Sequence, residues 1–175
     1  MHTNEKVAEV FLQESIRAFE SMKQLADKTL IQLEDEHFHQ ALDGESNSME
    51  ILIKHMHGNM LSRWTDFLTT DGEKEWRNRD GEFESKSFNR QELISLWEEG
   101  WQVLFGTLQS LTADDVLSLV MIRGEANTVL QAIQRQVSHY GYHVGQMVFL
   151  GKHLASNSWT TLSIPRGQSK AFKPN

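Results

Sequence analysis

The chain has 175 residues, of which 39% are hydrophobic and 23% are charged, as is typical of one globular domain. Its net charge of −7 argues against general binding to nucleic acid or to anionic lipid, because both require a basic surface. The chain has no cysteine, which excludes disulfides, thiolate ligands and a cysteine nucleophile. A transition metal would therefore have to be bound by histidines and carboxylates.

The N-terminal segment, MHTNEKVAEVF, lacks the basic region and apolar run of a signal peptide, and no stretch is apolar enough to span a bilayer. We therefore expect a cytoplasmic protein with no membrane partner. Thr3 or Asn4 can cap a first helix that runs to about Glu36. Apolar residues recur there at intervals of three and four, as on a core-facing helix: Val7, Val10, Phe11, Ala18, Met22, Leu25 and Leu33.

A second helix is predicted after a connection at 35–46. Asn47 and Glu50 have the spacing of a capping box, and the helix continues to about Leu68. Its apolar positions are Met49, Leu52, Ile53, Met56, Met60, Trp64 and Phe67. The polar segment 73–87 that follows is long for a connection between helices, and long loops are often functional.

A third helix begins with a second capping-box pattern, Asn89 with Glu92, and its apolar stripe continues to Leu111. Segment 117–123 (LSLVMIR) is the one short stretch that could be extended, and a loop at 124–127 follows it.

A fourth helix is predicted at about 127–155, followed by an ordered or half-ordered tail at 156–175. Only two prolines occur, Pro165 and Pro174, so the chain before them is free to be helical. Four long amphipathic helices predict an all-α four-helix bundle. We expect one domain over 1–175, with its core at about 4–155.

The fourth predicted helix carries a polar stripe in a core-facing register: Gln136, His139, His143 and Gln146. Polar side chains are costly to bury unless they are paired. His139 and His143 are one helical turn apart, roughly 5–6 Å at Cβ, so two imidazoles can bind one metal ion. The alternative is a pair of hydrogen-bonded or surface histidines. The order H-Y-G-Y-H lacks the glutamate of H-E-x-x-H, which argues against a metalloprotease.

A third ligand would come from the second helix, which offers His55 and His57 in the stretch KHMHGNM. The two side chains point about 200° apart around the helix, and both flank its apolar face. Periodicity does not choose between them and slightly favours His57, which lies over Trp64 on that face.

Two histidine patterns resemble signatures of the DinB/YfiT-like superfamily. They are Ser48-Met49-x-x-Leu52-x-x-His55-Met56 and His139-x-x-x-His143-x-x-Gln146. The strings NMLSRWTDFLTTDGEKEWRNRDGEFE (59–84) and WTTLSIPRGQSKAF (159–172) resemble one uncharacterised bacterial branch of that superfamily, so the resemblance covers nearly the whole chain.

The resemblance implies an up-down-down-up four-helix bundle in which His55, His139 and His143 bind one divalent metal ion, zinc or nickel. It also implies a homodimer and leaves His57 at the surface or rim. Such a site has open coordination positions for water or a small substrate. Each ligand needs an acceptor for its second ring nitrogen, and Asn59, Gln136 and Gln146 are the candidates.

Aromatic and basic residues near the predicted site have two interpretations. Trp64, Trp76, Arg77, Arg79 and Asp80 either line a mouth beside the metal or belong to a structural loop. We favour a loop that Trp76 anchors, with Arg79 and Asp80 exposed. Trp97 and Trp101, on the third helix, are expected to pack in the core or in a dimer interface rather than to bind a ligand.

Characterised relatives in the superfamily include bacillithiol- and mycothiol-dependent transferases and isomerases. The first hypothesis is therefore a metal-dependent enzyme, of thiol S-transferase or hydrolase type, acting on a small-molecule substrate such as a low-molecular-weight thiol. The second is a non-enzymatic, stress-related dimeric bundle with a structural or vestigial metal site. The space above the ion discriminates between them.

Overall fold

The computed structural model describes residues 2–85 and 88–171, and this part of the chain is mostly helical. The α-helices are α1 (His2–Leu30), α2 (Met49–Trp64), α3 (Arg79–Glu82), α4 (Arg90–Ser110) and α5 (Val129–Ala155). Short 3-10 turns lie at Asp35–Phe38, Ala113–Asp115, Ser156–Ser158 and Ser169–Ala171, and two strands at β1 (Leu119–Ile122) and β2 (Glu125–Thr128).

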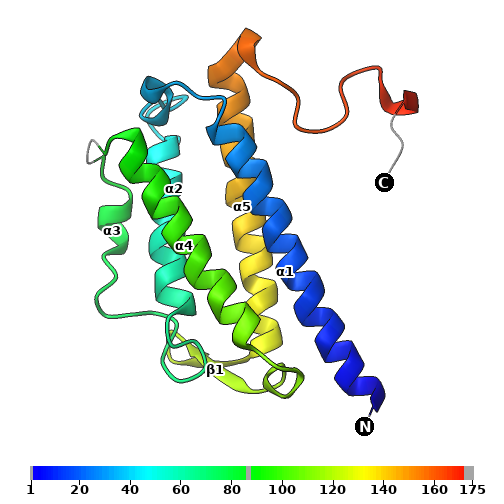
Figure 1. Cartoon of the computed structure of the whole chain (residues 1–175). Coiled ribbons are helices and arrows are strands. Elements are labelled where there is room, and N and C mark those ends of the chain that lie inside the picture. The colour runs from blue at the N-terminus through cyan, green and yellow to red at the C-terminus, as the bar shows by residue number, and fades with distance from the viewer. Residues whose placement is uncertain (1, 86–87, 172–175) are drawn as a thin grey trace.

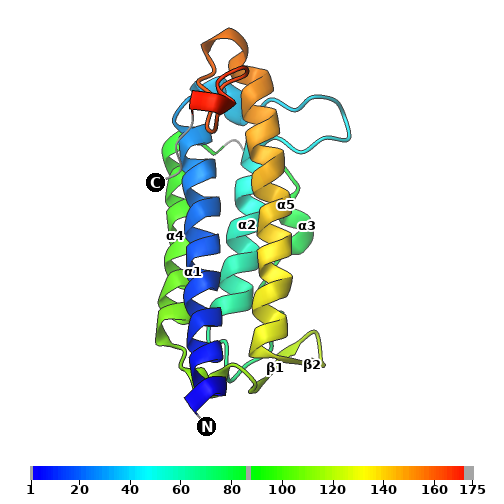
Figure 2. The same cartoon turned by 90° about the vertical axis from the view of Figure 1, so that its right-hand side faces the viewer.

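The four long helices lie side by side, and in Figure 1 α1 and α5 run upward while α2 and α4 run downward. Helix α2 packs mainly against α4, and α1 packs mainly against α5. Figure 2 shows the same four helices from a second direction, with α2 next to α5. Contacts between α2 and α5 matter most for function, because these two helices carry the candidate ligands.

Large aromatic side chains fill the space between the helices. Phe19 of α1 contacts Trp64, Trp101 and Tyr140 at ring-centroid distances of 5.8–6.4 Å. Trp97 and Trp101 are buried in this core, as one of the two alternatives for them predicted. The indole Nε1 of Trp97 donates to Asp27 Oδ1 at 2.7 Å, so its polar atom is satisfied although the ring is buried.

Two helices end earlier than their apolar periodicity predicts. Helix α1 stops at Leu30 rather than at about Glu36, and the guanidinium of Arg90 donates to the carbonyl oxygens of Leu30 (3.2 Å) and Leu33 (2.8 Å). A basic side chain that binds the last carbonyls of a helix stabilises its end. Helix α2 stops at Trp64 rather than at about Leu68, because Asp66 has a φ of 49°, outside the helical region.

The helix starts are closer to expectation, but α1 begins at His2, so Thr3 and Asn4 lie inside it and neither caps it. Ser48, not Asn47, caps α2, and its side chain accepts from the backbone N–H of Ile51. The capping box of Asn89 and Glu92 at the start of α4 is confirmed.

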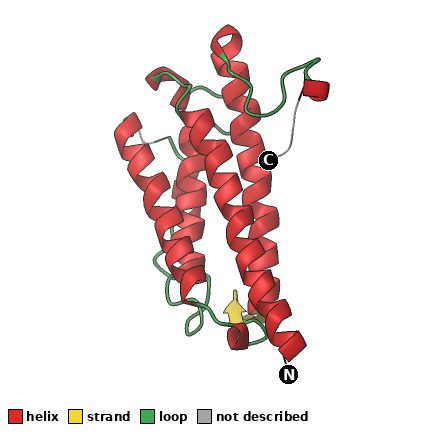
Figure 3. Ribbon diagram, turned by 45° about the vertical axis from the view of Figure 1, so that its right-hand side comes forward, coloured by secondary structure: helices red, strands yellow, loops and turns green. Residues whose placement is uncertain are grey.

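A β-hairpin precedes α5, at the end of the molecule where α1 begins (Figure 3). The first strand, β1, lies inside the segment 117–123 that could be extended, whereas β2 occupies residues predicted as a loop and a helix start. Ile122 pairs with Glu125, so Arg123 and Gly124 form a two-residue turn in which both φ angles are positive (55° and 76°). Such turns suit the right-handed twist of the paired strands.

The tail is described as far as residue 171, and the prediction for 172–175 lies outside the described residues. Its start is attached to the segment just after α1, because Gln32 Oε1 accepts from the backbone N–H of Thr160 at 2.6 Å. Across residues 2–85 and 88–171, no helix combines the length and the apolar character needed to cross a membrane.

Candidate metal centre

Three imidazoles from two helices meet between α2 and α5. His55 Nε2 lies 3.3 Å from His139 Nε2, and His143 Nε2 lies 3.1 Å from the same atom. All three candidate ligand atoms lie within 4.8 Å of one another. In a tetrahedral site with metal–nitrogen bonds of about 2.0–2.1 Å, two ligand nitrogens are roughly 3.3 Å apart. The two distances to His139 Nε2 therefore fit ligands of one ion, and the remaining pair of atoms lies within 4.8 Å.

The other ring nitrogen of each histidine faces an oxygen acceptor. His55 Nδ1 lies 2.9 Å from Glu82 Oε2, and His143 Nδ1 lies 2.8 Å from Gln146 Oε1. His139 Nδ1 lies 3.3 Å from Gln136 Oε1. An ionised carboxylate oxygen and an amide oxygen both accept hydrogen bonds, and neither can donate one. Each Nδ1 therefore carries the proton.

When the three imidazoles are neutral, this arrangement of protons leaves three unprotonated Nε2 atoms facing one another. Neutral imidazoles with Nδ1–H have only lone pairs at Nε2, so no hydrogen bond can join the three atoms. A cation placed among them would accept all three lone pairs. The donor set, three neutral imidazoles, suits a transition-metal ion better than the hard ions magnesium and calcium.

Burial favours the neutral form of His139 and His143. Burial, and to a smaller extent electrostatic repulsion from His143, His55, Arg77 and Arg63, lowers the pKa of His139 from 6.5 to about 3. Burial also lowers the pKa of His143. Metal binding requires neutral histidine, so protons compete weakly at this site near pH 7.

An ion pair from the segment between α2 and α4 supports His55. Arg77 donates through Nε to Glu82 Oε1 at 2.7 Å and through Nη2 to Oε2 at 2.9 Å, and both side chains are buried. Burial alone raises the pKa of Glu82, but the hydrogen bonds from His55 and Arg77 outweigh it and lower the pKa below the ordinary value. The carboxylate thus stays ionised and fixes the ring of His55.

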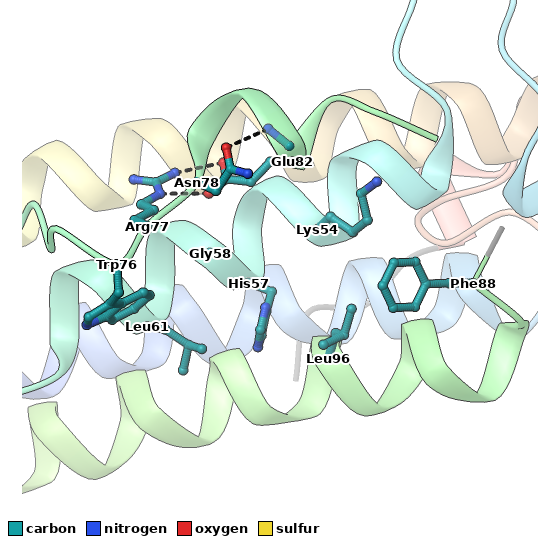
Figure 4. A pocket seen from close by; sticks show the side chains of 11 residues that line it. Lys54, His57, Gly58, Leu61, Trp76, Arg77, Asn78, Glu82, Phe88 and Leu96 are labelled. Atoms are coloured by element: carbon teal, nitrogen blue, oxygen red, sulfur yellow. Dashed lines mark hydrogen bonds and ion pairs between the residues drawn. The ribbon is translucent and has the colours of Figure 1, made fainter. Parts of the chain in front are cut away.

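Figure 4 shows this ion pair beside a groove between α2 and α4 with a volume of ≈ 290 Å³. The approach of Glu82 to α2 depends on Gly58, three residues after His55. A Cβ atom built on Gly58 would lie 2.9 Å from the Glu82 carboxyl carbon Cδ, and closer still to Oε1. Glycine in the interior of a helix weakens it, so Gly58 is the feature of the sequence that could have indicated the close approach of another side chain to α2.

Several predicted residues lie elsewhere than the cluster. His57 Nε2 contacts Glu99 Oε2 of α4 at 2.9 Å, so the residue that periodicity slightly favoured is not among the three that meet. Asn59 does not contact a histidine of the cluster in any hydrogen bond of the described residues. It accepts from the hydroxyl of Tyr140 at 2.8 Å, and that hydroxyl accepts from Trp64 Nε1 at 3.1 Å.

The segment 73–87 has a different anchor from the one predicted. Trp76 is 60% exposed, so it does not hold the segment in place, whereas Arg77 is buried and does. Arg79 and Asp80 are exposed, as predicted. Glu82 and Phe83 are the residues of this segment that contact His55, and they were missed because nothing in their local pattern indicates which helix they face.

The helical fold and the buried cluster define a class of protein, a helical protein with a three-histidine group that can hold a metal ion. A family model described as "Protein of unknown function (DUF1572)" matches residues 6–168, so the chain belongs to this family. No curated protein and no solved structure gives a significant match to the chain.

Proposed function

We propose that the chain is a DinB-like four-helix bundle of one domain, in which His55, His139 and His143 bind a divalent ion, zinc or nickel. The convergence of three unprotonated Nε2 atoms carries this proposal, because three facing lone pairs repel one another without a cation. The up, down, down, up course of the long helices in Figure 1 supports the DinB-like assignment.

The bound ion would act as a Lewis acid toward a small substrate, such as a low-molecular-weight thiol or a hydrolysable bond. Glu82, Gln136 and Gln146 hold the three rings in the tautomer that presents Nε2. Glu82 is engaged by His55 and Arg77, so it positions a ligand and is not free to move a proton. We therefore propose a metal-dependent thiol S-transferase, with a hydrolase as the neighbouring possibility.

The space beside the cluster supports an enzyme rather than a structural ion. A cavity of ≈ 400 Å³ is lined by Gln146, which contacts His143, and by Tyr142. A structural ion needs no such space, since its coordination is closed by protein ligands. The homodimer stays a prediction, which light scattering at several protein concentrations measures.

Metal content tests the proposal. Protein purified without chelator, or back-titrated with zinc or nickel, should hold one divalent ion per chain by elemental analysis. His139→Ala and His143→Ala should abolish this binding, whereas His153→Ala should not, because His153 is exposed further along the same helix. A wild-type protein that stays metal-free after back-titration contradicts the proposal.

Turnover is tested separately on the metal-loaded protein. Transfer of a low-molecular-weight thiol to a chloro-aromatic acceptor should be seen with the wild type and lost in His143→Ala. Hydrolysis of activated esters without thiol transfer would favour the hydrolase. A protein that binds metal but shows neither reaction would favour the non-enzymatic bundle.

A further inference from the structure

We propose that the cavity between α5 and segment 42–47 binds the non-reacting part of the substrate, and that it accepts an uncharged or cationic group with both apolar and hydrogen-bonding parts. This inference rests on the proposed function, because it takes the three-histidine cluster as the place of reaction. Its volume of ≈ 400 Å³ lies within the range of about 300–1,000 Å³ for small-molecule sites.

The helix geometry places this cavity directly next to the cluster. Gln146 follows His143 by three residues on α5, and Leu52 precedes His55 by three residues on α2. Because α2 and α5 run in opposite directions, both steps lead toward the same end of the molecule (Figure 1). With a rise of 1.5 Å per residue, the nearest cavity wall lies about 4.5 Å along the helices from the histidines.

The side chains of Gln146 and Tyr142 line the cavity and also contact His143 of the cluster. Gln146 accepts from His143 Nδ1 through Oε1 and donates through Nε2 to the hydroxyl of Tyr142 at 3.1 Å. The ring of Tyr142 lies against the ring of His143, with centroids 4.9 Å apart. A molecule in the cavity therefore touches the residues that orient one ligand of the cluster.

The lining of the cavity indicates the chemistry of its ligand. Apolar surface comes from Leu42, which is 41% exposed, from Phe149, which is 67% exposed, and from Leu52, Leu150 and the Tyr142 ring. Ser46 and Asn47 add hydrogen-bonding groups, and Glu45 is the only charged residue among the described lining residues. A carboxylate without a basic neighbour in the lining disfavours an anion and attracts a cation.

The groove between α2 and α4 is less suitable for this role. The buried ion pair of Arg77 and Glu82 forms part of its lining (Figure 4), together with the basic side chain of Lys54. A ligand in that groove would remove water from charged side chains, whereas the side chain that joins the cavity between α5 and segment 42–47 to the cluster is the neutral amide of Gln146.

Hydroxamates test the inference, because the head group binds a metal ion and the tail can be varied. Their affinities for the zinc-loaded protein are measured by calorimetry. We expect 3-phenylpropanohydroxamate to bind about tenfold more tightly than acetohydroxamate, which corresponds to burial of roughly 60 Å² of apolar surface. We also expect 4-aminobutanohydroxamate to bind more tightly than glutaric monohydroxamate, and Glu45→Gln to reduce that difference.

Variants assign the gain to the cavity. Leu42→Asn and Phe149→Asn should remove the tenfold gain of the phenyl tail and leave acetohydroxamate affinity unchanged. The matched control is Leu68→Asn, because Leu68 is 42% exposed and lies outside the cavity lining. This control should change neither affinity.

The outcomes separate the two proposals. Equal affinity for the two neutral hydroxamates, or a phenyl gain that survives in both cavity variants, overturns the cavity inference alone. Preferred binding of the anionic tail overturns the ligand class. A zinc-loaded protein that binds no acetohydroxamate, or a protein that takes up no zinc, overturns the proposed function and the inference with it.

Discussion

Gly58→Ala is a substitution for which helix propensity and the metal centre predict opposite effects. In a helix interior, alanine is more stable than glycine by about 0.5–1 kcal/mol. Here the added Cβ would lie 2.9 Å from Glu82 Cδ, whereas a comfortable contact is about 3.5–4.0 Å. The carboxylate must therefore retreat by about 1 Å, and its 2.9 Å hydrogen bond with His55 Nδ1 is broken.

Loss of the acceptor releases the ring of His55 from its ligating orientation. Removing such a partner of a metal ligand typically lowers metal affinity about 10–100-fold, or about 1.4–2.7 kcal/mol. We expect this loss for Gly58→Ala, measured by zinc competition with a chromophoric chelator. Urea unfolding of the metal-free protein, followed in parallel, shows whether the fold itself is retained.

A control and a double variant isolate the cause. Gly106 is also inside a long helix, but a Cβ there meets nothing within 4 Å, so Gly106→Ala should gain helix stability without changing zinc affinity. In a Glu82→Ala background, Gly58→Ala should cause no further loss of affinity, because the displaced carboxylate is already absent. Wild-type affinity in Gly58→Ala, or an equal loss in both backgrounds, would refute the reasoning.

Three further predictions concern stability. The unfolding free energy of the metal-free protein should fall as the pH falls from about 6.5 toward 3. In this range His139 is protonated in the unfolded state but not in the folded state, where its pKa is about 3. Urea titrations should show that His139→Gln reduces this acid sensitivity. Tyr140→Phe should lower the unfolding free energy by about 1–3 kcal/mol, since it leaves the buried polar atoms of Trp64 and Asn59 without their partner, and zinc affinity should stay unchanged. Asp71→Ala should speed amide hydrogen exchange in the hairpin turn, because the Asp71 carboxylate accepts from the backbone N–H groups of residues 123 and 124; unchanged exchange would contradict this role.

The four long helices and one of their caps follow from local chemistry, so the sequence predicts them. The box of Asn89 and Glu92 needs only neighbouring residues, and it begins α4 as expected. The predicted ends of α1 and α2 were wrong. For α1, Arg90 donates to the last carbonyl oxygens from a position 60 residues after Leu30, and no local pattern shows that contact. The second strand of the hairpin was missed for a similar reason, since a strand becomes visible only through its partner.

The candidate metal centre likewise has one part that local sequence determines and another that only the tertiary structure decides. The spacing of His139 and His143 on one helix face, with Gln146 one turn further on, was determined by the sequence, because helical periodicity alone brings these side chains together. The choice of His55 over His57 was decided by tertiary structure, since it depends on how α2 is rotated against α5. Glu82 was decided there too, because a folded connection and the missing side chain of Gly58 allow its carboxylate to reach the cluster.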